Sequence, residues 1–246
     1  MPVPPSASPP GHGLVLKDLH AGYRGIPVVR ELDLEVRPGE VVALLGPNGA
    51  GKTTTLETIA GLYRPISGTV ELSGQNVGGK PAHVLAREGL ALVPEGRALF
   101  PGLTVREHLR LAGGRGAGRR EEELLEMLPE LRKCLNRKAG LLSGGEQQML
   151  AVGRALVTRP RLLLVDEMSL GLAPVIVERL LPILRRAAAE LGSSVLFVEQ
   201  HVALALDISD RAYVLAHGRI RLEGPAAELR ERRDLLAASY LGETAA

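Results

Sequence analysis

One stretch of eight residues has the composition and spacing of a phosphate-binding loop: Gly46-Pro47-Asn48-Gly49-Ala50-Gly51-Lys52-Thr53. It matches the pattern G-x-x-x-x-G-K-[ST], in which backbone N–H groups of a glycine-rich turn surround a phosphate. The lysine adds a flexible positive charge for the outer phosphates, and the final hydroxyl can bind Mg²⁺. The stretch therefore predicts a nucleotide site.

The residues on either side of this loop predict a strand and a helix. Residues 41–45 form a short continuous apolar run, which is typical of a buried parallel strand. Residues 54–60 place Leu56, Ile59 and Ala60 on one helical face. A helix that begins there directs its positive end at the phosphates. The alternative is a glycine-rich turn without a ligand, but this pattern arises by chance only about once per hundred chains of this length.

Two adjacent carboxylates follow another apolar run, at residues 163–165. Asp166 can hold Mg²⁺ through water, and Glu167 is placed to orient and deprotonate an attacking water. A lone Asp-Glu pair is more often an ordinary strand end. The phosphate-binding loop upstream favours the catalytic interpretation.

A third stretch lies between these two and reads Leu142-Ser143-Gly144-Gly145-Glu146-Gln147. Ser143 with Glu146 three residues later fits a capping box on a helix that runs to Leu156. The two adjacent glycines are poor choices for a first helical turn. Bare backbone at this place lets a phosphate approach the helix N-terminus closely.

With these motifs in this order, the sequence resembles the ATP-binding cassette (ABC) ATPase family over nearly all of residues 14–242. The resemblance implies a P-loop α/β fold and the cofactors ATP and Mg²⁺. It also implies that residues 143–146 of one subunit close over ATP held by the phosphate-binding loop of the other. Two ATP molecules are then held in a head-to-tail dimer.

The resemblance assigns a role to each matching residue. Tyr23 matches the aromatic residue that stacks on adenine, and the alternative is a core tyrosine at a strand end. Asp166 matches the metal-holding aspartate, and Glu167 matches the general base. The contacts to phosphate and Mg²⁺ match Lys52, Thr53 and Thr54.

Three regions depart from the general family pattern. Glu95 replaces a glutamine that touches Mg²⁺ and the attacking water; a carboxylate can bind Mg²⁺ but repels the γ-phosphate. Alignment places Gln200 at the position of a switch histidine, with His201 one residue later, so both stay candidates. Met168 replaces a proline and Leu172 an aspartate in the next loop, and we expect Met168 to loosen that loop and slow hydrolysis.

The strings VPEGR, LSGGEQQM, SLGLAP and VEQ resemble the LivF-type subunit of branched-chain amino-acid importers. This implies an ATPase that works peripherally at the cytoplasmic face of the cell membrane and drives uptake through membrane permease subunits. An extracytoplasmic substrate-binding protein is an indirect partner. The close alternative is the ATPase of an importer of urea or amides. The dimer is homomeric or, as the resemblance favours, formed with a related ATPase.

Two other function classes fit less well. An ABC protein that acts on nucleic acid or the ribosome usually has two cassettes, a long coiled coil or a basic stripe, and none is visible. The net charge of +2 produces no strong field, so we expect no nucleic-acid partner. A small-molecule kinase with a P-loop would leave LSGGEQQ unexplained.

The chain of 246 residues is long enough for one large α/β domain. Residues 14–242 are the expected ABC ATPase domain. Proline-rich residues 1–13 are an expected disordered leader, and residues 243–246 are a tail. We expect a mostly parallel sheet, a small antiparallel β-subdomain and an all-helical insert at about residues 103–159, where no strand-like run occurs.

Within the insert we expect a helix capped by Thr104 and an amphipathic helix over residues 119–135. Residues 226–241 also have a helical pattern. No apolar run approaches the roughly eighteen residues that cross a bilayer. The predicted strands cover residues 14–23, 30–36, 41–45, 69–72, 90–93, 161–165, 195–198, 211–215 and 219–222.

Overall fold

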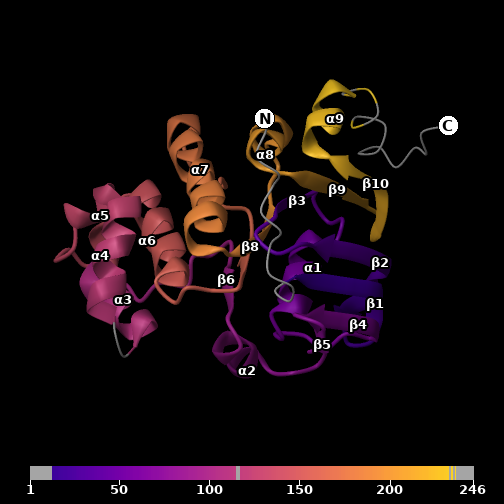
Figure 1. Cartoon of the computed structure of the whole chain (residues 1–246), viewed down its shortest axis with the longest axis horizontal. Helices are drawn as coiled ribbons and strands as arrows, with labels where there is room; N and C mark the ends of the chain where they lie inside the picture. The colour runs from indigo at the N-terminus through magenta and orange to yellow at the C-terminus, as the bar shows by residue number, and fades with distance from the viewer. Residues whose placement is uncertain (1–12, 115–116, 233, 235, 237–246) are drawn as a thin grey trace, which may run out of the picture.

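The computed structural model describes residues 13–114, 117–232, 234 and 236. The expected tail and nearly all of the expected leader lie outside the described residues, as does the end of the helix predicted over residues 226–241. Within the described part, that helix is α9 (Ala226–Glu231). Figure 1 shows two sheets, with a cluster of helices at one end of the molecule and an antiparallel sheet at the other.

The larger sheet has six strands and is mostly parallel, as predicted. Only the pair of β9 (Arg211–Ala216) and β10 (Arg219–Pro225) is antiparallel, and the other neighbouring strands are parallel. The central strands are buried on both faces, which explains their continuous apolar sequences. From one edge to the other the strands are β10 (Arg219–Pro225), β9 (Arg211–Ala216), β3 (Val41–Leu45), β8 (Ser194–Val198), β7 (Leu162–Val165) and β6 (Leu90–Val93).

The two faces of this sheet contact different cores. Along β3, Val41, Ala43 and Leu45 pack into a core shared with the helical region and α7 (Pro174–Leu191). Val42 and Leu44 point to the other face, which packs on α1 (Lys52–Ile59) and the antiparallel sheet. The alternation of side chains along the strand produces this three-layer arrangement.

The second sheet is antiparallel and has the order β2-β1-β4-β5, with bounds Ile26–Val36, Leu14–Tyr23, Ser67–Leu72 and Gln75–Asn76. Strand β2 begins at Ile26, four residues before the predicted start. The reason is a two-residue hairpin turn in which Arg24 and Gly25 both have positive φ, so Tyr23 pairs directly with Ile26. In the second half of β2, buried leucines alternate with exposed acidic residues, as predicted.

Helices occupy the chain between β6 and β7. They are α3 (Val105–Gly113), α4 (Ala117–Met127), α5 (Pro129–Arg132), the 3₁₀ turn η1 (Ala139–Leu141) and α6 (Gly144–Leu156). Thr104 caps α3 with a full capping box, as expected. Two shorter helices complete the described fold, α2 (Ala82–Arg87) and α8 (Val202–Ile208).

The single helix predicted over residues 119–135 is wrong. The chain breaks between α4 and α5 at Leu128, which has φ −127° and ψ 66°. Pro129 causes the break, since proline disfavours helical backbone in the preceding residue and fits the first position of a new helix. The predicted apolar face is nevertheless buried, because Leu124, Leu128 and Leu131 all lie in the core.

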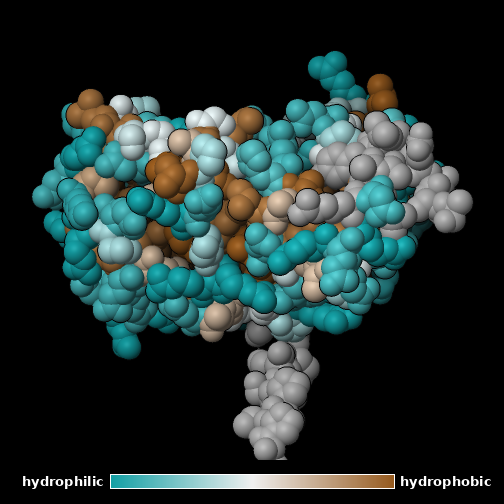
Figure 2. Space-filling view, turned by 90° about the horizontal axis from the view of Figure 1, so that it is seen from above, coloured by the Kyte–Doolittle hydropathy of each residue, from teal (hydrophilic) through white to brown (hydrophobic). Residues whose placement is uncertain are grey.

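Among the described residues, no helix combines the length and the apolar character that a membrane crossing requires. Seen from the side on which α7, α8 and α9 lie, apolar surface gathers near the middle of the molecule, between two mostly hydrophilic ends (Figure 2).

Candidate nucleotide site

The phosphate-binding loop connects β3 to α1, as the sequence indicated. Gly46 and Gly51 have φ values of 147° and 108°, which side chains rarely tolerate. A Cβ atom at Gly46 would also clash with the carbonyl oxygen of Leu215. Helix α1 begins at Lys52, so its first backbone N–H groups face the loop.

Lys52 is buried inside this loop, with 4% of its surface exposed. Its ammonium group donates hydrogen bonds to the carbonyl oxygens of Gly46 (2.9 Å) and Pro47 (3.0 Å). It also lies 3.7 Å from Oε1 of Glu167. Burial lowers the pKa of Lys52, while the carboxylates of Glu167 and Asp166 oppose that shift. The ammonium charge of Lys52 therefore lies inside the loop, where an anion would bind.

Asp166 directly follows β7 and is 2% exposed. The hydroxyl of Thr53 donates a hydrogen bond of 3.3 Å to its Oδ1 atom. Burial, with the nearby carboxylates of Glu167 and Glu95, raises the pKa of Asp166 to about 6. A divalent cation would offset this excess of negative charge, and Thr53 and Asp166 supply oxygen ligands of the kind that Mg²⁺ prefers. The described residues contain no cluster of three or more His, Cys, Asp or Glu side chains that would bind a metal alone.

Glu167 follows Asp166 and has a φ of 41°, which is unusual for a residue with a side chain. Its Oε2 atom accepts a hydrogen bond of 2.8 Å from Nε2 of Gln200. His201 is exposed and occupies the N-cap position of α8. The structure therefore places Gln200, and not His201, beside the carboxylate pair.

These groups surround one hollow of about 450 Å³. Glu95 and Gln200 form part of its wall, together with residues of the phosphate-binding loop. The residues predicted to contact nucleotide or metal that line this hollow are Tyr23, Asn48, Gly49, Gly51, Lys52, Thr53, Thr54, Glu95, Glu167 and Gln200. The other predicted site residues do not line it: Gly46, Pro47, Ala50, residues 143–146, Asp166 and His201.

Tyr23 lies at the rim of the hollow and is 40% exposed, so it is not a core tyrosine. Its hydroxyl lies 3.1 Å from Oγ1 of Thr54 and 3.4 Å from Oε2 of Glu57. The ring of Tyr63 meets it edge-on, with centroids 4.9 Å apart. These contacts fix the ring and leave part of its surface open to a ligand.

The stretch at residues 143–146 begins α6 and forms the expected capping box. The N–H of Glu146 donates to the Ser143 hydroxyl (3.3 Å), and the N–H of Ser143 donates to the Glu146 carboxylate (2.7 Å). Gly145 has a packing role that the sequence did not reveal, since a Cβ there would lie 2.9 Å from Cγ2 of Ile176. Gly144 is exposed and has no such restriction. Ser143 and Gly144 are both exposed, and Gly144 presents bare backbone to the outside of the chain.

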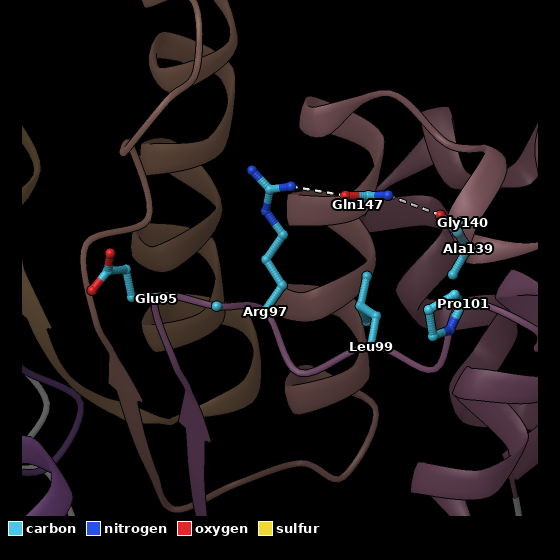
Figure 3. Close-up of a pocket in the computed structure, with 8 residues that line it drawn as sticks. Glu95, Arg97, Leu99, Pro101, Ala139, Gly140 and Gln147 are labelled. Carbon is cyan, nitrogen blue, oxygen red and sulfur yellow. Dashed lines mark hydrogen bonds between the residues drawn. The ribbon is translucent and has the colours of Figure 1, made fainter.

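Arg97 connects the segment after β6 to α6. Its guanidinium donates to Oε1 of Gln147 (2.8 Å) and Oε1 of Gln148 (2.9 Å). Arg97 also lines a second hollow of about 240 Å³, between residues 95–101 on one side and Ala139, Gly140 and Gln147 on the other (Figure 3). The figure shows Arg97 pointing toward Gln147 and away from Glu95.

The sequence analysis did not identify Glu199, which is a fully buried carboxylate. It accepts hydrogen bonds from the backbone N–H groups of Ser169, two residues after Glu167, and of Gln200. A signal was present, because Glu199 follows the apolar run of β8 as Asp166 follows that of β7. Met168 is 1% exposed and packs in the core. Its expected effect on the loop and on hydrolysis stays a prediction.

Comparison with known proteins gives consistent results. The family model described as ABC transporter matches residues 29–169. The chain is 42% identical to the high-affinity branched-chain amino acid transport ATP-binding protein BraG of Pseudomonas aeruginosa, over 84% of this chain and 90% of the relative. It is 38% identical to the probable branched-chain amino acid transport ATP-binding protein LivF of Archaeoglobus fulgidus, over 87% and 92%. A dimeric, post-hydrolysis ATP-binding cassette with ADP and Pi superposes with a TM-score of 0.77 at 26% identity, over 87% and 98%.

Proposed function

The chain belongs to the ABC transporter family of ATPases, and from this membership we propose that it drives the import of branched-chain amino acids. The observation that carries the solute class is the likeness, over nearly the whole length, to two proteins named for branched-chain amino acid transport. Solute specificity lies in partner proteins, so this chain supplies the energy and not the selectivity.

Within the site, we propose that Tyr23 stacks on adenine and that the loop at residues 46–54 holds the phosphates. Lys52 has two hydrogen bonds to loop carbonyls that phosphate oxygens can replace. Glu167 accepts a proton from the attacking water, and Gln200 orients its carboxylate. We assign the switch role to Gln200, because its side-chain amide donates a hydrogen bond to Glu167, whereas His201 is exposed at the N-cap of α8.

We propose that Mg²⁺ accompanies ATP and is shared between the phosphates and the side chains of Thr53 and Asp166. Glu95 lines the same hollow and is a further oxygen ligand. When bound, the cation neutralises phosphate charge. Phosphate oxygens would supply further ligands, of the kind that Mg²⁺ prefers.

We propose that the working unit is a dimer in which Ser143, Gly144, Gly145 and Glu146 of one subunit contact ATP of the other. Two facts support this arrangement. In a single chain these residues do not line the nucleotide hollow. A structural relative is dimeric and bound to ADP and Pi. The second subunit is a related ATPase or another copy of this chain.

We propose that the chain is peripheral to the cytoplasmic face of the membrane and binds permease subunits through the second hollow (Figure 3). Residues 95–101 form one wall of this hollow and run directly into the nucleotide site at Glu95. Phe100, at 54% exposure, is available to a partner on this segment. Closing and opening of the dimer would therefore reach the permease through these residues. The substrate-binding protein acts outside the membrane and does not touch this chain.

Reconstitution with the permease and binding protein in vesicles tests the proposal. Leucine, isoleucine or valine is expected to stimulate ATP hydrolysis, while urea and acetamide are not. Stimulation by urea alone would reject amino-acid import. The isolated Glu167→Gln chain is expected to bind ATP and to dimerise. If it does neither, the proposed ATPase mechanism is wrong.

A further inference from the structure

Glu199 directly follows β8, and its side chain has no exposed surface. Its Oε1 atom accepts a hydrogen bond of 3.1 Å from the N–H of Ser169. Its Oε2 atom accepts bonds from the hydroxyl of Ser169 (2.5 Å) and from the N–H of Gln200 (3.3 Å). One buried carboxylate is therefore shared between the loop after β7 and the chain after β8.

Burial of a carboxylate is unfavourable unless hydrogen-bond donors surround it. Glu199 has three donors, two of which are backbone N–H groups with fixed positions. Ser169 is itself only 6% exposed, so water does not compete for its hydroxyl. The carboxylate thus fixes the positions of both loops relative to each other.

The residue that needs this support is Glu167. Its positive φ is an unfavourable conformation that persists only where the surrounding structure imposes it. On one side, its N–H donates to the carbonyl oxygen of Val198 (3.2 Å). On the other side, Ser169 is held by Glu199, two residues further along the loop. Both anchors belong to the end of β8.

The same carboxylate also holds the start of the second loop. Gln200 is bound through its backbone to Glu199 and through its side chain to Glu167. Hydrogen bonds join Glu199 to Ser169 and Gln200, and Gln200 to Glu167. The chain from Glu167 to Ser169 closes this ring at the junction of the two loops. Glu199 does not line the nucleotide hollow, so it acts through its neighbours.

We propose that Glu199 is a positioning residue for ATP hydrolysis, which holds both loops in the register where Glu167 and Gln200 meet at the same ATP. The inference rests on the proposed function, because it needs Glu167 to act on the attacking water. The site that binds the phosphates lies on other elements, so ATP binding does not depend on Glu199.

The first test is the steady-state ATPase activity and the ATP affinity of the purified Glu199→Gln chain. The amide has one acceptor oxygen, so either Ser169 or Gln200 loses its partner. We expect kcat to fall about tenfold or more, since displacements of about 1 Å can reduce rates about 10²-fold. The Kd for ATP is expected to stay within about twofold of wild type, because Lys52 and its loop are unchanged.

Glu40→Gln is the matched control. Glu40 is also a buried carboxylate (8% exposed) that accepts a backbone N–H, from Arg37 at 2.7 Å, but it directly precedes β3 at the opposite end of the sheet. We expect it to lower Tm about as much as Glu199→Gln and to leave kcat unchanged. Equal kcat losses in both variants would show a general effect of stability and would overturn the proposal.

A double-mutant cycle with Gln200→Ala tests the route of action. If Glu199 acts partly through the Gln200 side chain, the loss in the double variant is smaller than the product of the two single losses. Fully multiplicative losses would reject this route. Should Glu199→Gln fail to fold, Ser169→Ala removes only the hydroxyl contact and is expected to lower kcat with an unchanged KM.

The two proposals fail in different ways. If Glu167→Gln hydrolyses ATP at the wild-type rate, the proposed catalytic role of Glu167 is wrong. If Glu167→Gln is inactive while folded Glu199→Gln and Ser169→Ala chains are fully active, only the positioning role is wrong.

Discussion

Gln200 Nε2 donates a hydrogen bond of 2.8 Å to Glu167 Oε2, although the two residues are 33 positions apart in the chain. The contact exists because β7 and β8 are parallel neighbours, so the segments that follow them meet at the same edge of the sheet. Lys52 approaches the other oxygen of Glu167, at 3.7 Å. The carboxylate is thus held between a neutral donor and a positive charge.

This relationship predicts different effects for two adjacent residues. Gln200→Ala is expected to lower kcat about tenfold or more, because the Glu167 carboxylate loses its neutral donor. His201→Ala is expected to stay within about twofold of wild type, since that side chain lies outside the hollow. Steady-state ATPase rates of the two variants provide the comparison. A larger loss in His201→Ala would transfer the switch role to His201.

The ring of Tyr23 is expected to contribute to ATP affinity through stacking. Tyr23→Ala should weaken ATP binding by about 1–2 kcal/mol, or roughly five- to thirtyfold in Kd. Tyr23→Phe keeps the ring and loses only the hydroxyl contacts to Thr54 and Glu57, so it should bind ATP nearly as well as wild type. Titration with a fluorescent ATP analogue measures both. Equal losses in the two variants would indicate that the hydroxyl, and not the ring, matters.

Substitutions of the two adjacent glycines at the start of α6 are expected to have different effects, one on the stability of the fold and the other on dimerisation. Gly145→Ala places a Cβ 2.9 Å from Ile176 and is expected to lower Tm. Gly144→Ala meets no atom closer than 3.5 Å and should fold normally. We expect it instead to weaken ATP-dependent dimerisation of the Glu167→Gln chain, measured by sedimentation, because phosphate approaches the bare backbone. Unchanged dimerisation would argue against contact at Gly144.

The raised pKa of Asp166 predicts a pH-dependent stability. Its folded pKa of about 6 exceeds its usual value of 3.8, so ionisation destabilises the fold as pH rises through this range. In EDTA without nucleotide, Asp166→Asn should therefore be more stable than wild type above pH 6, by about 3 kcal/mol. The difference should vanish below about pH 3, where the carboxyl is protonated in both states. A Tm difference that is independent of pH would contradict the assignment.

The sequence by itself determined the fold class, because its strands are either continuous apolar runs or clean alternations. Val41–Leu45 and Leu162–Val165 are each buried on both faces, and no polar residue interrupts them. It also identified the phosphate-binding loop and the capped start of α6, since each is a local motif whose geometry follows from adjacent residues.

The hydrophobic pattern did not predict the bounds of two elements, because a proline or a tight turn determined where each one begins or ends. Pro129 divided a helix whose apolar spacing continued across it, since periodicity does not register a missing N–H group. The Arg24-Gly25 turn extended β2 beyond the part that alternates. In both places one or two backbone conformations outweighed the hydrophobic pattern.

Only the tertiary structure decided which of Gln200 and His201 meets Glu167, and it alone revealed Glu199. The physical reason is that adjacent residues after a strand point in different directions, and their partners come from another strand end. The sequence lists the carboxylates that follow β7 and β8, but it does not state that those strands are neighbours. Their parallel pairing brings Ser169, Glu199 and Gln200 into contact around one catalytic carboxylate.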